Sequence, residues 1–548
     1  MKISKILTVA AVALSATLAL SGCIRETFPK EGAITESQLM GGQMDVVAEN
    51  LLKGIPSGIL SPTPYFWEHT DFGYPSIPVY TDQAAKLVVV NGWTVGNATG
   101  YNRFMHAPWG KGYGPNGWMS THFWYSYYPN IKSCNDVIAL TAGNEDLASY
   151  SAIARTYRAN MYLDLGRLFE AMPVYAEELG NSSTYDDLCL QVAGLTVPIV
   201  NEDTDESAAK NNPRVTREEL FTFILDDLKF AEEAFSGDYT PSQPTDPTLA
   251  VVYGLYARVY MWLGGFEDGL NGELPEGDAA YTLASEYAQK AIAAHGGAIM
   301  TEAEWTNVKS AFNTKVASWM WTLYHSTDTL ASNLHNFVAH MVPEAEYGYT
   351  PFTHPGVSSE AFDHLGDGDF RKKLIKGPET TYEEFKNYTS YGKDGFDQFA
   401  PYTFFKFRPA QGNRTDYSIA AAIAIPMMRC EEMYFIDMEA TLHTQGVDAA
   451  WQKLVTFMAT RDANYICPVA DEDGMLREIL FQKGIEFWGE GIKMFDMKRL
   501  DKGYDAAFEG TNYPADARFK IAGRAPWWSY CIPKDETDMN KAAALQGS

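Results

Sequence analysis

Residues 150–175, YSAIARTYRANMYLDLGRLFEAMPVY, carry the clearest structural pattern in the chain. Apolar side chains recur there at steps of three or four residues, the spacing that places them on one face of an α-helix. The stripe consists of Tyr150, Ile153, Tyr157, Met161, Leu165 and Leu168. Pro173 follows, and a proline does not continue a helix because it lacks the N–H group. The stretch therefore predicts a helix that buries this stripe and ends before residue 173.

Further helices follow the same design on the C-terminal side of this stretch. Thr216 and Glu219 fit a capping box, in which two side chains satisfy free N–H groups at a helix start. A helix is expected within residues 248–266, and it should end at Gly264 and Gly265, because glycine favours a helix C-terminus. Helices are also expected over residues 281–297, 427–446, 448–465 and 476–500. The paired segments are similar to tetratricopeptide-like helix hairpins, although no strict period of about 34 residues is visible.

Two stretches lack helical spacing. Residues 65–128 combine many aromatic side chains with Gly, Pro and Asn, and residues 316–326 (VASWMWTLYHS) alternate like a short strand. The chain is therefore expected to be mainly α, with little strand and an irregular, loop-rich region that is either folded onto the core or ligand-facing. We expect a signal peptide over residues 1–22 and one domain over 23–548. Its expected parts are a tether and first helix (23–60), aromatic loops with helix pairs (61–300), an irregular region (301–425) and C-terminal helices (426–548).

The N-terminus is typical of an exported protein. Lys2 and Lys5 precede an apolar run, Ile6 to Leu20, that is too short to span a bilayer and suits a signal peptide. The run closes with ALSGC at residues 19–23, which is similar to the lipobox of bacterial lipoproteins. The alternative is an ordinary signal peptide with an incidental cysteine. We expect Cys23 to be lipidated and to anchor the chain, because several acyl chains hold a protein firmly on a membrane.

Composition and motifs exclude several functions. The formal net charge of −27 argues against nucleic acid as a partner, because such a surface repels phosphate backbones. The cysteines show no CxxC spacing, so neither a zinc site nor a disulfide framework is indicated. No Walker A, His-Glu-x-x-His or Gly-x-Ser-x-Gly motif occurs. We therefore expect no cofactor, no metal and no catalytic residue.

The aromatic loops are the best candidate for a binding site. Trp93, Asn97, Tyr101, Arg103 and Trp109 bring flat rings and hydrogen-bonding groups together within a short segment. Exposed rings suit the apolar face of a sugar, and amide or guanidinium groups suit its hydroxyls. A second interpretation places the rings in the core. On the helices, Trp262, Trp451 and Trp488 are expected to be core residues.

Several segments, in a shared order, give the chain a resemblance to the SusD/RagB family of surface lipoproteins. Residues 123–138 (FWYSYYPNIKSCNDVI), 154–175, 211–233 (NNPRVTREELFTFILDDLKFAEE), 248–266, 427–441 (MMRCEEMYFIDMEAT), 486–500 (EFWGEGIKMFDMKRL) and 531–540 (CIPKDETDMN) resemble its motifs. Two of these segments depart from the family pattern. Glu170 and Ala171 replace a glycine-containing turn, and Lys493 stands where arginine is usual.

The resemblance implies a fold and a site. The fold has four tetratricopeptide-like helix pairs as its scaffold, and one side packs on a TonB-dependent transporter. Family members that bind glycans use loop aromatics, which by location points to Trp67, Trp93, Tyr101, Trp109 and either Tyr347 or Tyr349. We interpret the charged residues of two motifs as helix-stabilising pairs rather than catalytic groups. The pairs are Arg429 with Glu432 and Asp496 with Arg499.

Three functions follow as hypotheses. The first is a lipoprotein, anchored in the cell outer membrane and facing the exterior, that captures a glycan and passes it to a SusC-like transporter. The second is an oligopeptide binder of the same architecture, as in the RagB branch. The third is a helical glycoside hydrolase, although no carboxylate pair stands out for that chemistry.

Overall fold

The computed structural model describes residues 44–63, 69–91, 114–173, 192–267, 269, 272–326, 330, 332–469 and 471–544. The chain divides into a unit of residues 1–48 and a unit of residues 49–548. The first long helix, α3, spans Met44–Leu60. The expected signal peptide and Cys23 lie outside the described residues.

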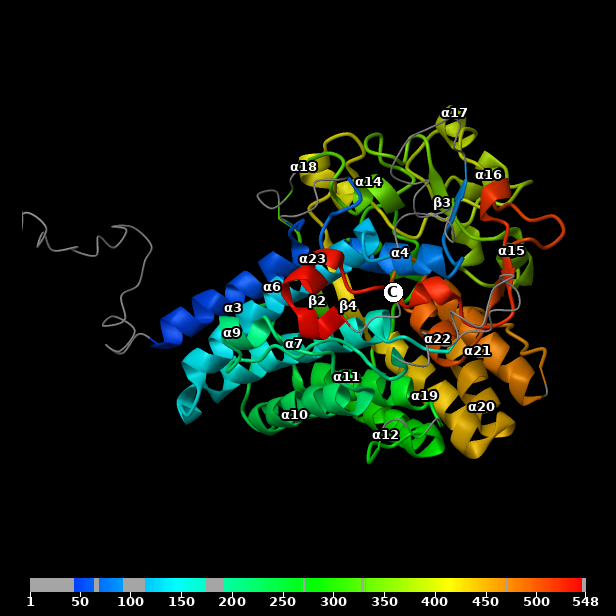
Figure 1. Ribbon diagram of the computed structural model, residues 1–548. Coiled ribbons are helices and arrows are strands. Elements are labelled where there is room, and N and C mark those ends of the chain that lie inside the picture. The colour runs from blue at the N-terminus through cyan, green and yellow to red at the C-terminus, as the bar shows by residue number, and fades with distance from the viewer. Residues whose placement is uncertain are drawn as a thin grey trace, which may run out of the picture. The chain divides into compact units, whose positions relative to one another are not determined.

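Long helices that pack against their neighbours in chain order form the scaffold (Figure 1). They are α6 (Trp118–Thr141), α7 (Ala148–Phe169), α10 (Arg217–Phe235), α11 (Leu249–Leu263), α12 (Gly277–His295), α19 (Cys430–Gln445), α20 (Val447–Met458) and α21 (Glu472–Glu486). Helix α6 contacts α7, α7 contacts α10, α10 contacts α11, α11 contacts α12, and α12 contacts α19. Helix α19 also contacts α20 and α21. With 51% helix, the mainly α prediction is confirmed. The tetratricopeptide-like character of the pairs stays a prediction.

Helix α7 is the predicted helix of residues 150–175, and it is buried more completely than its stripe indicates. Ile153, Tyr157 and Met161 are buried as expected, but so is Arg158 on another face. Arg158 is tolerated there because Asp227 and Glu202 accept hydrogen bonds from its guanidinium group at 2.5–2.8 Å. A buried charge needs such partners. Helix α7 is thus enclosed by its neighbours α6 and α10.

The predicted helix boundaries at α10 and α11 are confirmed, one for the expected reason and one for another. At α10, the Glu219 N–H donates to Thr216 Oγ1 at 3.2 Å, and the Thr216 N–H donates to the Glu219 carboxylate at 2.8 Å. Helix α11 ends before Gly264, which keeps a right-handed conformation instead of forming a left-handed cap. Glycine is required because a Cβ there would lie 2.6 Å from the Tyr281 ring. Close packing of α11 on α12 therefore explains this glycine.

Short antiparallel sheets join separate segments of the described chain. Strand β1 (Val89–Asn91) pairs with β3 (His354–Gly356), β2 (Trp319–Tyr324) with β4 (Ala424–Arg429), and β5 (Tyr504–Asp505) with β6 (Lys520–Ile521). The strand expected within residues 316–326 is β2. The helix expected from residue 427 begins only at Cys430, because residues 424–429 pair with β2 as a strand.

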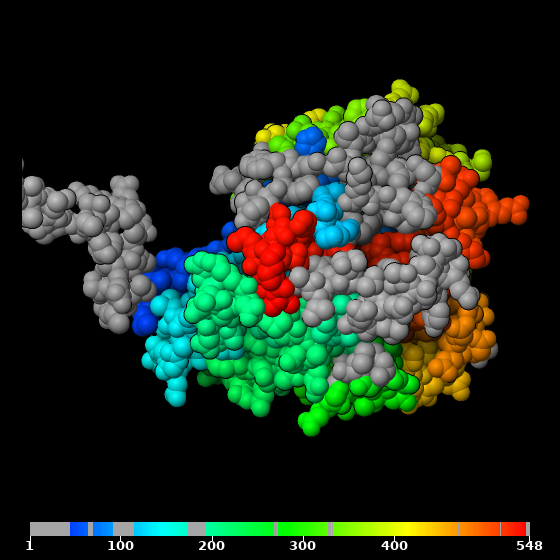
Figure 2. Space-filling view, viewed as in Figure 1, coloured from blue at the N-terminus to red at the C-terminus, as the bar shows by residue number. Residues whose placement is uncertain are grey.

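Shorter helices connect the long ones and occupy the central region, residues 301–425, which lies on the side opposite to α10 and α12 (Figures 1 and 2). The short helices are α4 (Ser76–Ala84), α9 (Glu206–Ala209), α13 (Glu302–Trp305), α14 (Val338–Met341), α15 (Ser359–His364), α16 (Tyr382–Phe385), α17 (Lys393–Phe396), α18 (Tyr417–Ala420), α22 (Lys493–Arg499) and α23 (Lys534–Met539). In the described residues, 3-10 turns lie at Glu145–Leu147, Lys372–Leu374, Ala410–Gly412, Ala515–Ala517, Pro526–Trp528 and Lys541–Ala544. Within the described part of the chain, no helix combines the length and apolarity needed to cross a membrane.

The core is continuous across scaffold and central region. Trp262 and Trp488 are fully buried in it, as expected, and Trp451 is half-buried against a smaller cluster around α19–α21. The Trp488 indole N–H donates to the Gly356 carbonyl at 3.1 Å, which ties the segment after α21 to β3. The irregular region is therefore held on the scaffold by buried contacts.

Candidate functional site

The predicted binding residues fall into two groups. Trp67, Trp93, Asn97, Tyr101, Arg103 and Trp109 lie outside the described residues, and so does the lipidation candidate Cys23. Tyr347 and Tyr349 are described, and both follow α14 in the central region. The described part of the expected site therefore lies around these two tyrosines.

Gly348 separates the two tyrosines and gives them different environments. Its φ of 73° lies in the left-handed region, and a Cβ there would lie 2.4 Å from the Cβ of Ala339. This close approach allows the Tyr349 N–H to donate to the Ala339 carbonyl at 2.9 Å. Tyr347 is buried and its ring packs edge-on against Tyr417, at 6.3 Å between centroids. Tyr349 is only half-buried.

Tyr349 meets an exposed histidine from the N-terminal part of the chain. Its hydroxyl lies 2.6 Å from Nδ1 of His69, and the ring centroids are 6.0 Å apart. His69 also contacts His335 edge-on, with 5.3 Å between centroids. Ser332 Oγ lies 2.7 Å from Nδ1 of His335. Residues from three separate segments thus bring polar ring edges together, and we name His69, His335, His340 and Tyr349 the His–Tyr cluster.

His340 forms the base of the His–Tyr cluster. It is buried, stacks on Phe72 with 4.6 Å between ring centroids, and lies 5.0 Å from the Tyr349 ring. Burial lowers the pKa of His340 to about 4, so it is neutral at pH 7. Its Nε2 lies 2.9 Å from the Leu334 carbonyl, so this nitrogen carries the proton. The base of the cluster is therefore rigid and uncharged.

A turn continues from Tyr349 to an exposed aromatic ring. The Tyr349 carbonyl accepts hydrogen bonds from the N–H groups of Phe352 and Thr353, each at 2.9 Å. Phe352 is 50% exposed. Single exposed apolar side chains are common on protein surfaces. Here, the turn holds the backbone of Phe352 three residues after Tyr349 of the His–Tyr cluster.

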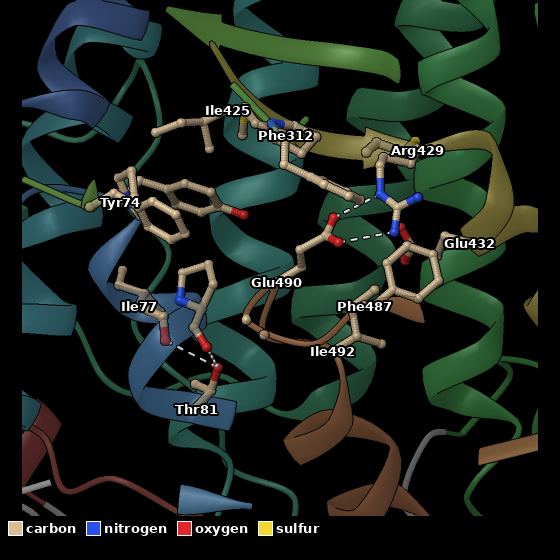
Figure 3. A pocket seen from close by; sticks show the side chains of 18 of the residues that line it. Tyr74, Ile77, Thr81, Phe312, Ile425, Arg429, Glu432, Phe487, Glu490 and Ile492 are labelled. Atoms are coloured by element: carbon tan, nitrogen blue, oxygen red, sulfur yellow. Dashed lines mark hydrogen bonds and ion pairs between the residues drawn. The ribbon is translucent and has the colours of Figure 1, made fainter. Parts of the chain in front are cut away.

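Charged side chains of the C-terminal motifs line a small cavity in the core (Figure 3). Its volume is about 70 Å³, enough for a few water molecules and too small for a sugar ring. Two Arg429 nitrogens donate to the two Glu490 oxygens at 2.9 Å each, and Arg258 donates to Glu432 at 2.6 and 2.7 Å. These charges are paired with one another across the packed elements.

The expected pairing of Arg429 with Glu432 is wrong. Both residues have other partners, because β4 ends at Arg429 and points its side chain toward Glu490, while Glu432 faces α11. The expected pair of Asp496 and Arg499 is present at 2.8 Å, and Arg499 also binds Glu439. Among the described residues, no group of three His, Cys, Asp or Glu side chains is arranged to hold a metal ion.

Comparisons with known proteins agree with this architecture. The model of the SusD family matches residues 317–541. A SusD-like carbohydrate binding protein from Bacteroides vulgatus has a similar structure (TM-score 0.66, 20% identity, covering 91% of this chain and 97% of that chain). A SusD superfamily protein from Bacteroides thetaiotaomicron (0.64, 18%, 92% and 99%) and one from Parabacteroides distasonis (0.64, 15%, 91% and 98%) are also similar. The comparison with curated proteins gave no match.

These findings confirm the resemblance on which the expected fold depends. At such identities, the solved structures show a common fold and do not transfer a ligand. The His–Tyr cluster was missed by sequence reasoning, because its histidines are scattered along the chain. The family resemblance pointed by location to either Tyr347 or Tyr349, and it did not distinguish the buried ring from the accessible one.

Proposed function

Since the SusD family resemblance is confirmed, we propose that this chain is a glycan-binding protein that captures its ligand at the His–Tyr cluster and performs no chemistry on it. SusD-like proteins are in general non-enzymatic and bind carbohydrates. The observation that carries the proposal is the cluster itself. Tyr349 and His69 bring two polar ring edges together, and the exposed ring of Phe352 follows three residues later in the chain. A sugar is recognised by that combination of a flat ring and hydrogen-bonding groups.

The proposed site also includes the loop residues expected from the sequence. Trp67, Trp93, Asn97, Tyr101, Arg103 and Trp109 are proposed as further ligand contacts. His69 follows directly on the first of these segments, and β1 directly precedes the second. The His–Tyr cluster and the loop residues are therefore proposed to form one surface.

The binding proposal is tested by affinity gel electrophoresis with a panel of polysaccharides. The variants Tyr349→Ala, His69→Ala, Trp93→Ala and Trp109→Ala are each expected to weaken retardation about tenfold, corresponding to ~1.4 kcal/mol. Phe230→Ala, which removes a part-exposed ring from α10, is the control and should bind normally. Unchanged retardation in all four variants would eliminate the site. Binding of oligopeptides that depends on the same residues would instead favour the alternative ligand.

We further propose that this chain is an outer-membrane lipoprotein and that it delivers its ligand to a SusC-like TonB-dependent transporter. SusD family proteins are generally associated with the outer membrane and work with such transporters. Anchoring through Cys23 would keep captured ligand at a high effective concentration beside the channel. Metabolic labelling with palmitate should mark the chain and should be lost in Cys23→Ala. A labelled but monomeric protein, with no transporter in mild-detergent extracts, would contradict the partner. Release of reducing sugar by the purified protein would support the glycoside hydrolase instead.

A further inference from the structure

A second cavity, of about 620 Å³, lies between α15, α21, α22 and the β5–β6 sheet. This volume lies in the range of about 300–1,000 Å³ that is usual for small-molecule sites. Among the described residues, the cavity shares no lining residue with the His–Tyr cluster or with the small cavity of Figure 3. It is therefore a separate place for a small molecule, and the groups on its wall indicate which kind.

The charges on the wall of this cavity balance one another. Among its described lining residues, four are carboxylates and four are Lys or Arg, namely Glu360, Asp473, Glu478, Asp505, Lys86, Arg477, Lys493 and Lys502. Asp473 pairs with Arg477 and, at 3.4 Å, with Lys502. Asp505 pairs with Lys520 at 2.9 Å. Because the wall carries equal numbers of opposite charges, it favours a ligand without net charge.

A histidine and a phenylalanine form an aromatic corner of the cavity. The rings of His364 on α15 and Phe481 on α21 meet edge-on, with 4.2 Å between their centroids. His364 Nε2 lies 2.7 Å from one oxygen of the Glu478 carboxylate. The other oxygen of Glu478 accepts hydrogen bonds from the Tyr465 hydroxyl at 2.7 Å and from the Gln482 amide at 2.8 Å. Glu478, itself held on both sides, therefore fixes the orientation of the imidazole ring.

This aromatic corner is accessible to a ligand and has a hydrogen-bonding group beside it. The His364 side chain is 44% exposed, and Phe481 is half-buried. Glu360, one helical turn before His364 on α15, is exposed and also lines the cavity. A carboxylate accepts hydrogen bonds from hydroxyl groups, and an aromatic ring packs against the apolar face of a sugar. A neutral ligand with several hydroxyls and one apolar face thus matches these groups.

We propose that this cavity is a second carbohydrate site, which binds a small neutral sugar against Phe481 and His364, with Glu360 accepting hydrogen bonds from its hydroxyls. A purely apolar ligand would take water from the exposed polar groups without replacing their hydrogen bonds. An ion would meet a wall whose charges already balance. The site is separate from the His–Tyr cluster, so sugar binding in the cavity does not depend on glycan capture at that cluster.

Isothermal titration of the purified full-length chain tests this binding. The probes are glucose, galactose, mannose, xylose and cellobiose, with glucuronate and galacturonate as charged counterparts. We expect saturable binding of at least one neutral sugar and weaker binding of the two uronates. Phe481→Leu should weaken the binding about three- to tenfold, because it keeps an apolar side chain and loses the ring. Phe230→Leu, the same change at a part-exposed ring of α10 outside the cavity, is the matched control.

Further variants test the location. Ala361→Trp, on the α15 wall, should abolish the binding that Phe481→Leu weakens, because it fills the cavity, whereas Ala142→Trp at the exposed end of α6 should not. Tyr349→Ala impairs only the His–Tyr cluster and should leave that binding in place. Circular dichroism and thermal unfolding establish that each variant is folded.

Four results would overturn the second site. They are no saturable binding of any neutral sugar in the panel, tighter binding of the uronates, equal affinity of Phe481→Leu and Phe230→Leu, and equal affinity of folded Ala361→Trp and Ala142→Trp. Loss of all sugar binding in Tyr349→Ala would place the sugar at the His–Tyr cluster and would likewise overturn it. Phe481→Leu keeps the proposal testable should Ala361→Trp fail to fold.

Discussion

Glu486 on α21 accepts two hydrogen bonds from the guanidinium group of Arg461, at 2.9 and 3.0 Å, inside the core. Arg371 and Arg429 approach the same carboxylate at 3.2 and 3.3 Å. Burial alone would raise the pKa of Glu486, but Arg461 and Arg429 outweigh it and hold that pKa well below its usual range. One carboxylate therefore links the central region, the start of α19 and the segment after α20.

Replacing this carboxylate should destabilise the whole fold. We expect Glu486→Gln to lower the free energy of unfolding by about 3–5 kcal/mol, because it leaves buried guanidinium groups without their counter-charge. The measurement is urea unfolding followed by tryptophan fluorescence. Glu383→Gln, at an exposed surface pair with Lys386, is the matched control and should leave stability unchanged. Similar losses in both variants would contradict the central role of Glu486.

Asp82 should make stability fall as the pH rises. This carboxylate is fully buried on α4, where one oxygen accepts the N–H groups of Gly489 and Gly491 at 2.9 and 3.0 Å. The other oxygen has no hydrogen-bond partner among the described residues. Burial raises the pKa of Asp82 from 3.8 to about 7, although the two backbone N–H groups oppose it. The folded state therefore holds its proton more tightly than the unfolded state between these pH values, and the associated stabilisation is lost as the pH rises toward 7.

Asp82→Asn should remove this pH dependence. Asparagine can accept the same two N–H groups without becoming charged. The variant should gain roughly 3 kcal/mol relative to the unmodified chain between about pH 4.5 and pH 8. Urea unfolding at several pH values measures the difference. A constant difference across this range would show that Asp82 is not buried as a protonated group.

The same substitution at two glycines should have opposite effects. Gly264→Ala places a Cβ 2.6 Å from the Tyr281 ring and should cost about 1–3 kcal/mol through overpacking. Gly54→Ala lies in α3, where nothing is within 4 Å of the added atom, and should stabilise the helix by about 0.5–1 kcal/mol. Thermal unfolding of both variants measures this. Stabilisation by Gly264→Ala would show that α11 and α12 are less closely packed at this point.

Local patterns predicted the helices well, and long-range pairing could not be read from them. The stripe of α7 and the capping box at Thr216 depend on residues a few positions apart, so the sequence contains them. Arg429 was assigned to Glu432 because the two are neighbours in sequence. Its actual partner, Glu490, is 61 residues away. The strand β4 was missed for the same reason, since its pairing with β2 joins segments about a hundred residues apart in sequence.

The candidate site shows the same limit. Composition indicated that the aromatic loops matter, and the family resemblance pointed to Tyr347 or Tyr349, but no spacing connects His69 to Tyr349, which are 280 residues apart. The different burial of Tyr347 and Tyr349 depends on the backbone at Gly348. This glycine has a left-handed conformation and packs closely against Ala339. That contact exists only in the folded chain.

Two substitutions at Tyr349 separate its ring from its hydroxyl in ligand binding. If the ring stacks on a sugar and the hydroxyl, held by His69, positions it, Tyr349→Phe should keep most of the affinity and lose a few-fold, about 1 kcal/mol for one hydrogen bond. Tyr349→Ala should lose the stacking as well and bind about tenfold more weakly than the unmodified chain. Isothermal titration with the glycan selected by gel retardation measures both. Equal affinity of the phenylalanine and alanine variants would mean that the ring makes no contact, and His69 would then be the ligand-binding group that Tyr349 only orients.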